Sequence, residues 1–235
     1  MKIVIGNFKM NLNNLEINEY LEYFKDKKYS NVYFAPSNIY LKDFINNGFN
    51  TIAQDVSSYT SGAYTGDVSA NMLKSIGINY SLVGHSERRK YYNDDLFINE
   101  KIKRLLEENI IPILCIGENL EERNNNTYLE VIKKEIEEAF KSIDKNKLKS
   151  VIIAYEPIWS IGTNKIPSNE EIEEITKFIK EYIFKNYLFN IKVLYGGSVN
   201  NNNVDILNKI GIIDGYLVGG CSIKKEKFND LIRKV

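Results

Sequence analysis

The chain has 235 residues, and its 31 Lys plus Arg balance its 31 Asp plus Glu, so the net charge is zero. That balance leaves no large positive field to attract nucleic acid or an anionic membrane. No apolar run approaches the ~20 residues that span a bilayer, and the N-terminus turns polar too early for a signal peptide. We therefore expect a cytoplasmic protein without nucleic-acid or membrane partners.

Short apolar runs alternate with longer amphipathic runs along the whole chain. Several of the short runs are apolar at nearly every position, which is typical of parallel strands covered on both faces. We expect strands at residues 2–7, 31–35, 50–54, 79–83, 110–115, 150–155, 191–195 and 213–218.

The amphipathic runs predict helices between these strands. Apolar residues recur at spacings of three and four within 129–143 and 172–183, opposite a face rich in Glu and Lys. Thr127 with Glu130, and Ser168 with Glu171, fit the capping box that begins a helix. Less regular or shorter patterns predict further helices near 14–26, 38–47, 70–76, 94–108, 201–209 and 225–234.

No linker or change in composition divides the chain. Eight strands alternating with helices indicate an α/β fold, a single-domain (β/α)₈ barrel over residues 1–235. A doubly wound open sheet is the alternative, although it usually needs fewer strands or a longer chain. The two cysteines predict neither a disulfide framework nor a zinc site, and Cys115 ends an apolar strand, where we expect it to pack in the core.

Polar residues follow several of the predicted strands, at the end where such barrels carry their active sites. Taken singly, each has an ordinary explanation: a lysine after a strand is usually solvated, and a lone histidine is more often structural than catalytic. Together they place an acid, a base and a cation on one rim. The residues are Asn7 and Lys9 after the first strand, His85 and Glu87 after the fourth, and Glu156 after the sixth.

Two glycine turns follow the seventh and eighth strands, at Gly196-Gly197-Ser198 and Gly219-Gly220. Glycine permits close approach of the backbone, so that successive N–H groups can face one anion. Barrels frequently bind phosphate with these two loops. We therefore expect a small phosphorylated substrate.

The loop at 157–167 has an apolar middle, although it joins a strand to a helix at the surface. One interpretation is a loop that packs onto the barrel. The other is a lid that excludes water when it closes over the site.

Seven segments together resemble the triosephosphate isomerase family, in the order found in that family and over the whole chain. The sequences VGHSERR and AYEPIW with the following GT are the most specific of them. The segments are GNFKMN at 6–11, AYTG at 63–66, VGHSERR at 83–89, CIGE at 115–118, AYEPIWSIGT at 154–163, YGGSV at 195–199 and LVGG at 217–220.

The resemblance implies a TIM barrel that interconverts dihydroxyacetone phosphate and D-glyceraldehyde 3-phosphate through an enediolate, in glycolysis and gluconeogenesis, with no metal or organic cofactor. It implies that Glu156 is the base, His85 the neutral electrophile and Lys9 the cation that faces the oxyanion. It further implies that Glu87 supports Lys9 and His85, and that Asn7 binds substrate. The backbone positions implied to hold the phosphate are Gly162, Ser198, Gly219 and Gly220.

The chain departs from the family pattern at a few positions. Phe8 stands where the family usually has Trp, and Asn164 stands where the second hinge of the lid usually has Gly. Asparagine tolerates left-handed backbone better than most residues, so the lid is still expected to close. Ser160 and Cys221 replace what is commonly Ala. The loop at 57–69 resembles the segment that reaches into a partner's site, which predicts a homodimer with Thr65 in the interface.

Two alternatives remain open from the sequence. One is another barrel enzyme acting on a phosphorylated metabolite, such as an aldolase or a phosphoribosyl isomerase. A Schiff-base aldolase needs a desolvated lysine on an inner strand, and Lys9 is the only rim lysine of that kind. The other is a binding or surface protein that has kept the fold, since a fold does not prove a function.

Overall fold

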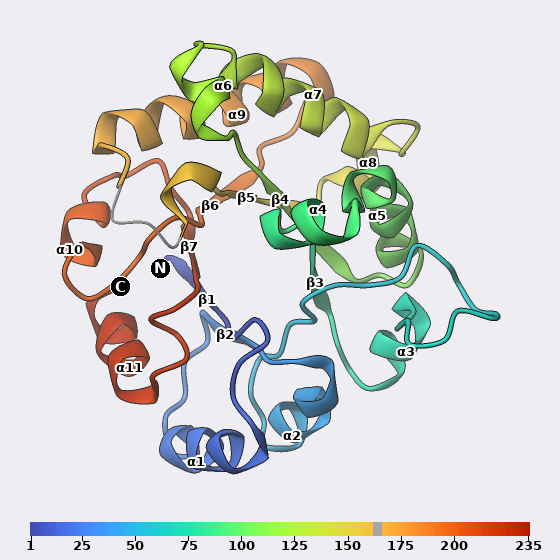
Figure 1. Cartoon of the computed structure of the whole chain (residues 1–235), viewed down its shortest axis with the longest axis vertical. Coiled ribbons are helices and arrows are strands. Elements are labelled where there is room, and N and C mark those ends of the chain that lie inside the picture. The colour runs from blue at the N-terminus through green and yellow to red at the C-terminus, as the bar shows by residue number, and fades with distance from the viewer. Residues whose placement is uncertain (162–165) are drawn as a thin grey trace.

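The computed structural model describes residues 1–161 and 166–235. Within these residues, seven parallel strands form one curled sheet at the centre of the molecule, and helices surround it (Figure 1). The strands are β1 Ile3–Asn7, β2 Val32–Ala35, β3 Tyr80–Val83, β4 Ile111–Ile116, β5 Ile152–Tyr155, β6 Lys192–Tyr195 and β7 Gly215–Val218. Their order, β2-β1-β7-β6-β5-β4-β3, places the first strand of the chain beside the last.

Residues 50–53 close the sheet into a barrel by lying between its two edge strands. Thr51 forms a bridge with Phe34 of β2, and Ala53 forms a bridge with Ser81 of β3. The N–H of Ile52 donates to Phe34 O at 2.9 Å, and the N–H of Leu82 donates to Ala53 O at 2.9 Å. The predicted (β/α)₈ barrel is therefore confirmed, although the strand expected at 50–54 is reduced to two bridges, because its pairing with each neighbouring strand extends over a single bridge.

Alternating strand residues divide the core into two apolar layers. Along β4, Ile113 and Cys115 point into the barrel, whereas Leu114 and Ile116 face the helices. Both faces are covered, which explains why the strands are apolar at nearly every position. The inner layer consists of Ile5, Ala35, Ile52, Leu82, Ile113, Cys115, Ile152, Ala154, Leu194 and Leu217.

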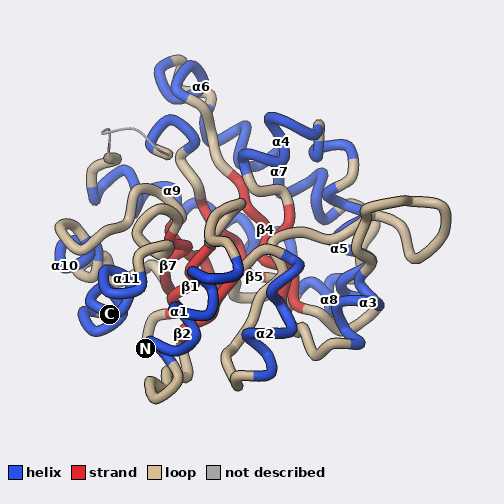
Figure 2. The backbone as a smooth tube through the Cα atoms, turned by 60° about the horizontal axis from the view of Figure 1, so that its bottom comes forward, coloured by secondary structure: helices blue, strands red, loops and turns tan. Residues whose placement is uncertain are grey.

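The helices form a ring around the strands, as the tube in Figure 2 also shows. No helix among the described residues is long and apolar enough to cross a membrane. Their bounds are α1 Asn14–Phe24, α2 Leu41–Asn46, α3 Ala70–Ser75, α4 Ser86–Tyr92, α5 Ile98–Glu107, α6 Leu120–Asn124, α7 Tyr128–Phe140, α8 Lys145–Leu148, α9 Asn169–Tyr187, α10 Val204–Leu207 and α11 Lys225–Lys234.

The two predicted capping boxes have different outcomes. At α9 the box is confirmed, since Ser168 Oγ accepts from the N–H of Glu171 and the Glu171 carboxylate accepts from the N–H of Ser168. At α7 it is wrong, because Thr127 has helical backbone angles and its hydroxyl donates to Glu122 O. An N-cap side chain reaches the helix N–H groups from extended backbone, which Thr127 does not adopt.

Candidate active site

A pocket of about 370 Å³ opens at the carboxyl ends of the strands. It collects side chains and turns from distant parts of the chain. Of the predicted phosphate-binding positions, Gly162 lies outside the described residues, as does the hinge position Asn164. The other predicted site residues all line this one pocket: Asn7, Lys9, His85, Glu87, Glu156, Ser198, Gly219 and Gly220.

Lys9 reaches the pocket because the backbone turns sharply after β1. Its φ is +52°, a left-handed conformation that is uncommon for a residue with a side chain. The turn is held by Asn7, whose Oδ1 accepts from the N–H of Lys9 at 2.9 Å. Gln54 Nε2 and Ser37 Oγ donate to Lys9 O at 2.9 and 3.2 Å. These three polar contacts stabilise a strained backbone at the site.

The ammonium of Lys9 is paired with Glu87. Lys9 Nζ lies 2.6 Å from Glu87 Oε1, and the two side chains are 23% and 44% exposed. Glu87 belongs to the first turn of α4, and this helix begins directly after His85. An ammonium at the pocket suits stabilisation of an anion. A Schiff-base reaction would require a neutral amine.

His85 is buried where β3 ends and α4 begins. Its Nδ1 accepts from the N–H of Glu87 at 3.3 Å, so this nitrogen carries the lone pair. The proton of a neutral imidazole is then on Nε2, which lies 3.2 Å from Glu156 Oε1. The backbone of α4 therefore selects the tautomer that presents a hydrogen-bond donor to the pocket.

Glu156 follows β5 and is only 3% exposed. Its Oε2 lies 3.4 Å from the N–H of Ser86, which donates to it, while Oε1 faces His85. Two glycines leave room for this residue. A Cβ on Gly196 would stand 2.8 Å from Glu156 Cγ, and a Cβ on Gly117 would stand 1.8 Å from Glu156 O. A buried carboxylate beside an imidazole N–H is an arrangement suited to proton transfer.

The two predicted phosphate turns follow β6 and β7 and line the same pocket. Ser198 Oγ donates to Ser160 O at 2.8 Å, and Asn203 Nδ2 donates to Ser198 O at 2.6 Å. Gly219 borders the Lys9 side chain, since a Cβ there would stand 3.4 Å from Lys9 Cε. The backbone of both turns thus borders the same space as Lys9, His85 and Glu156.

The described part of the 157–167 loop packs against a buried carboxylate. Trp159 Nε1 donates to Glu118 Oε1 at 2.8 Å, and Tyr155 Oη donates to the same oxygen at 3.1 Å. Burial raises the pKa of Glu118, while the hydrogen bond from Trp159 lowers it in part. Ile161 reaches the pocket wall. The lid itself stays a prediction, because residues 162–165 lie outside the described part.

Phe8, which replaces the usual family Trp, lies in the core rather than in the pocket. It is fully buried, and its ring packs 4.8 Å from Tyr20 and 5.7 Å from Phe44, measured between centroids. Cys115 is also buried, as expected. Burial raises the pKa of its thiol well above the usual range, and the neighbouring Glu156 raises it further.

Several supporting residues of the site have roles that the sequence does not indicate. Gly117 follows β4 and Gly196 belongs to an expected phosphate turn, but only the tertiary structure brings both glycines against Glu156. Arg89 and Glu135 were not singled out, although Arg89 belongs to the VGHSERR segment. In the described ranges, no group of three or more His, Cys, Asp or Glu side chains could hold a metal ion.

Comparison with known proteins matches the whole chain to one family. The family model for triosephosphate isomerase covers residues 2–235. A triosephosphate isomerase of Alkaliphilus oremlandii is 40% identical over 243 aligned positions, which span 98% of this chain and 98% of that protein. Proteins of the same name from Orientia tsutsugamushi and Mycoplasmopsis pulmonis are 40% and 38% identical, over 99% and 98% of this chain and 97% and 96% of their own lengths. The chain therefore belongs to the triosephosphate isomerase family.

Proposed function

We propose that this protein interconverts dihydroxyacetone phosphate and D-glyceraldehyde 3-phosphate, as a glycolytic and gluconeogenic isomerase. The observation that carries the proposal is the convergence of Glu156, His85 and Lys9 on one pocket of about 370 Å³ that is bordered by two glycine turns. A hydrogen on a carbon beside a carbonyl is only weakly acidic. Its removal therefore requires both a base and groups that stabilise the resulting enediolate.

In this reaction the Glu156 carboxylate takes a proton from C1 of dihydroxyacetone phosphate. The charge that develops on O2 is met by the Lys9 ammonium and by the Nε2–H of His85. O2 then gains a proton while the O1 hydroxyl loses one, and return of a proton from Glu156 to C2 gives glyceraldehyde 3-phosphate, with its aldehyde at C1. Substrate binding replaces the 3.2 Å contact between His85 Nε2 and Glu156 Oε1, so both groups face the reacting carbons and oxygens.

The remaining predicted site residues have supporting tasks in this proposal. Glu87 holds the Lys9 ammonium, and Asn7 both supports the turn at Lys9 and contacts substrate. The phosphate is bound by the backbone of Ser198, Gly219 and Gly220, together with Gly162. No metal or organic cofactor takes part.

The test is a coupled assay with glyceraldehyde 3-phosphate. We expect Glu156→Gln to lower kcat about 1,000-fold, since loss of a positioned general base costs roughly 10²–10⁴. Glu181→Gln, on the exposed face of α9, is the matched control and should leave kcat unchanged. Wild-type turnover no higher than that of Glu156→Gln would refute the assignment.

We propose further that residues 1–235 act as one catalytic domain in the cytoplasm. The pairing of β1 with β7 supports a single domain, because the first and last strands belong to one sheet. A single cooperative unfolding transition, monitored by both circular dichroism and tryptophan fluorescence, is the expected result. Separate transitions would contradict it.

We propose that the protein is a homodimer formed through residues 57–69. This loop projects from the barrel near α3, at the right of Figure 1. At its tip the exposed rings of Tyr59 and Tyr64 stack with centroids 3.8 Å apart. Its base is tied by Ser57, whose hydroxyl donates to Asp67 and whose N–H donates to Val68 O at 2.8 Å. Exposed tyrosines on an ordered projection are typical of a protein interface.

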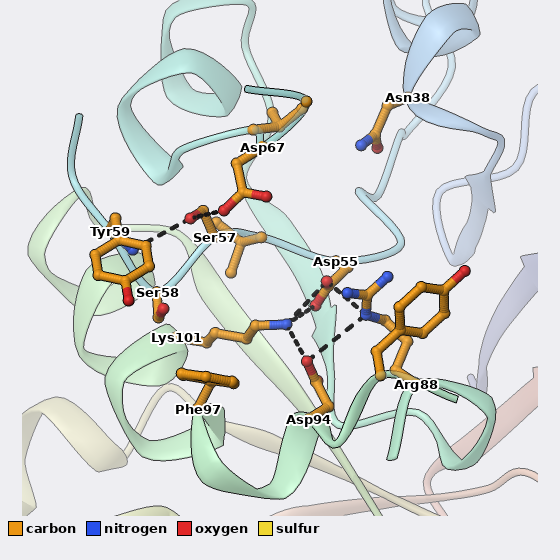
Figure 3. Close-up of a pocket in the computed structure, with 14 residues that line it drawn as sticks. Asn38, Asp55, Ser57, Ser58, Tyr59, Asp67, Arg88, Asp94, Phe97 and Lys101 are labelled. Atoms are coloured by element: carbon orange, nitrogen blue, oxygen red, sulfur yellow. Dashed lines mark hydrogen bonds and ion pairs between the residues drawn. The ribbon is translucent and has the colours of Figure 1, made fainter. Parts of the chain in front are cut away.

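The base of this loop rests on a compact ionic cluster, drawn in Figure 3. Lys101 Nζ lies 2.8 Å from Asp55 and 2.5 Å from Asp94, and Arg88 Nε lies 2.7 Å from Asp55. The charges of the two acidic and the two basic side chains balance one another. The cluster thus fixes the base of the loop relative to α4 and α5.

A hollow of about 700 Å³ beside Lys9 offers a matching receptor on the same chain. Its rim exposes Met10, Ile39, Tyr91 and Tyr92, which are 64–95% accessible. A projection and a hollow on one chain allow two copies to exchange loops about a twofold axis. Thr65 at the loop tip would then lie in the partner's hollow.

Sedimentation velocity tests this proposal. We expect the wild type to sediment at twice the mass of one chain. Thr65→Lys should shift it toward the monomer, while Glu138→Lys on α7 should not. A stable, fully active wild-type monomer would contradict the dimer.

A further inference from the structure

Arg89 joins the carboxyl ends of two neighbouring strands from behind the site. Its Nε donates to Gly84 O at 2.7 Å, and its Nη2 donates to Cys115 O at 2.8 Å. Gly84 follows β3 directly and precedes His85, whereas Cys115 belongs to β4. The side chain of Arg89 is only 12% exposed. One guanidinium thus sets the spacing between the end of β3 and the end of β4.

Glu135 of α7 fixes the orientation of this guanidinium. Its Oε1 lies 3.1 Å from Arg89 Nη1, and its Oε2 accepts from the N–H of Gly117 at 2.9 Å. Asp95 is a second carboxylate on Nη1. A guanidinium is a rigid planar fork, so its orientation is determined once carbonyls and carboxylates occupy its donors.

The groups held by Arg89 and Glu135 are the backbone supports of His85 and Glu156, two of the proposed catalytic residues. Gly84 leads into His85 in a left-handed turn, with φ +71°. Gly117 lies directly against the backbone of Glu156, where a Cβ would stand 1.8 Å from Glu156 O. The N–H of Glu156 itself donates to Ile116 O at 2.8 Å. A shift of either support changes the distance between His85 and Glu156.

We propose that Arg89, oriented by Glu135, is a positioning residue that sets His85 against Glu156 for proton transfer. This inference rests on the isomerase activity proposed above. Neither side chain lines the pocket, so both act through the backbone of Gly84, Cys115 and Gly117. A displacement of about 1 Å at reacting groups can lower a rate about 100-fold, which makes such remote control measurable.

The first experiment compares Arg89→Lys with Arg104→Lys. Lysine keeps the charge but cannot bind two carbonyls in one plane. Arg104 is a suitable control, because its guanidinium pairs with Glu100 and Glu107 within its own helix, α5. We expect Arg89→Lys to lower kcat 10- to 100-fold, with KM and the inhibition constant of inorganic phosphate within about twofold. Arg104→Lys should change none of these.

His85 provides a spectroscopic readout that does not depend on turnover. It is the only histidine of the chain, so its imidazole nitrogens give the only histidine signals in a ¹⁵N spectrum. We expect these signals to shift in Arg89→Lys and to stay in place in Arg104→Lys. A role limited to general stability would leave the signals of the folded variant unchanged.

The second experiment uses Glu135→Gln, which keeps an acceptor for the N–H of Gly117 but removes the charge beside Arg89. The charged groups that face Glu135 are Arg89 of α4, Asp95 before α5 and Glu122 of α6. Burial raises the pKa of Glu135 to about 7, although Arg89 and the Gly117 N–H oppose this shift. Wild type and variant should therefore have similar kcat at pH 6, where Glu135 is largely neutral. At pH 8 the variant should have a kcat roughly 3- to 10-fold lower than that of the wild type. This loss is smaller than the ~100-fold loss for a 1 Å displacement, because Arg89 itself is kept.

The outcomes separate this inference from the proposed activity. If the wild type does not isomerise the triose phosphates, the activity is refuted and the ¹⁵N signals alone decide the positioning role. The positioning role is refuted if Arg89→Lys folds with unchanged kcat or unchanged His85 signals. It is also refuted if KM and phosphate inhibition change as much as kcat does. Should Arg89→Lys fail to fold, an equal rate for wild type and Glu135→Gln at pH 8 would refute it.

Discussion

The two ends of the barrel contain hollows of similar size but very different chemistry. The hollow at the carboxyl ends of the strands measures about 370 Å³ and contains Asn7, His85 and Glu156, all nearly buried. The hollow at the amino ends measures about 400 Å³. Its lining includes the isoleucines at positions 3, 5, 52, 111, 113 and 152 and the rings of Tyr33 and Tyr80, which lie 5.1 Å apart, while polar residues such as Lys149, Asn190 and Lys192 complete it. Size therefore does not distinguish the active end, whereas directional polar groups do.

The two hollows differ in chemistry because one is lined by residues within the strands and the other by residues that follow them. At the amino ends the walls are the first strand residues, whose side chains alternate between the barrel interior and the helices. At the carboxyl ends the chain has left the hydrogen-bonded ladder. It is then free to adopt conformations that the ladder forbids, such as the left-handed backbone of Lys9. Polar side chains from separate strands can therefore converge there.

The strongest test of this comparison removes one lysine from each end. Lys9→Met should lower kcat/KM about 10²–10³-fold, the usual loss for one group that stabilises an oxyanion. Lys192→Met, at the rim of the opposite hollow, should change it less than about twofold. Steady-state kinetics in both reaction directions would measure this. Equal losses would mean that the two ends do not differ as proposed.

An inner-layer residue should affect stability and leave the chemistry intact. Ile113→Ala removes a fully buried side chain and should lower the free energy of unfolding by about 3 kcal/mol. Its kcat should stay within about twofold, because the residue belongs to the amino-end wall. Urea unfolding at fixed protein concentration would check this, with the half-exposed Ile206→Ala of α10 as the control. A large fall in kcat for folded Ile113→Ala would contradict this, because it would mean that packing at the amino end controls the chemistry at the carboxyl end.

A single methyl group at the carboxyl end should lower kcat and leave the fold intact. Gly196→Ala places a Cβ 2.8 Å from Glu156 Cγ, so the carboxylate must move. We expect kcat to fall about 10- to 100-fold while the fold is kept. Gly211→Ala is the control, because a Cβ there meets no atom of residues 1–161 or 166–235 within 4 Å. Similar kcat values for the two variants would show that the position of Glu156 is less constrained than the structure indicates.

The smallest effect is expected at the tyrosine pair of the amino end. Burial, followed by hydrogen bonding to Tyr80, raises the pKa of Tyr33 to about 12. Tyr33→Phe should remove one late step from the ultraviolet titration of the tyrosines. It should cost at most about 1 kcal/mol of unfolding free energy, the usual net value of one hydrogen bond. Any measurable change in kcat would contradict the assignment of this end as structural.

Most of the barrel could be predicted from the sequence, because its signals are local. Apolar runs placed β1 to β7 within two residues of their observed ends, and the residues after those runs gave Lys9, His85 and Glu156. The segment at 50–54 forms two bridges instead of the expected strand, because its pairing depends on two edge strands rather than on its own pattern. The sequence does not predict the short helices α4, α6 and α8, because none of them buries a regular apolar stripe.

The sequence by itself thus determined the fold class, the family and the set of polar groups on the rim, since strand composition and strand exits are readable residue by residue. Tertiary structure decided how those groups meet. It decided that the backbone of α4 turns Nε2 of His85 toward Glu156, and that Asn7, Ser37 and Gln54 hold the strained turn at Lys9. It also brought Arg89 and Glu135 together from different helices. The physical reason is that a hydrogen-bond partner distant in sequence leaves no periodic signal, so only the packed barrel specifies it.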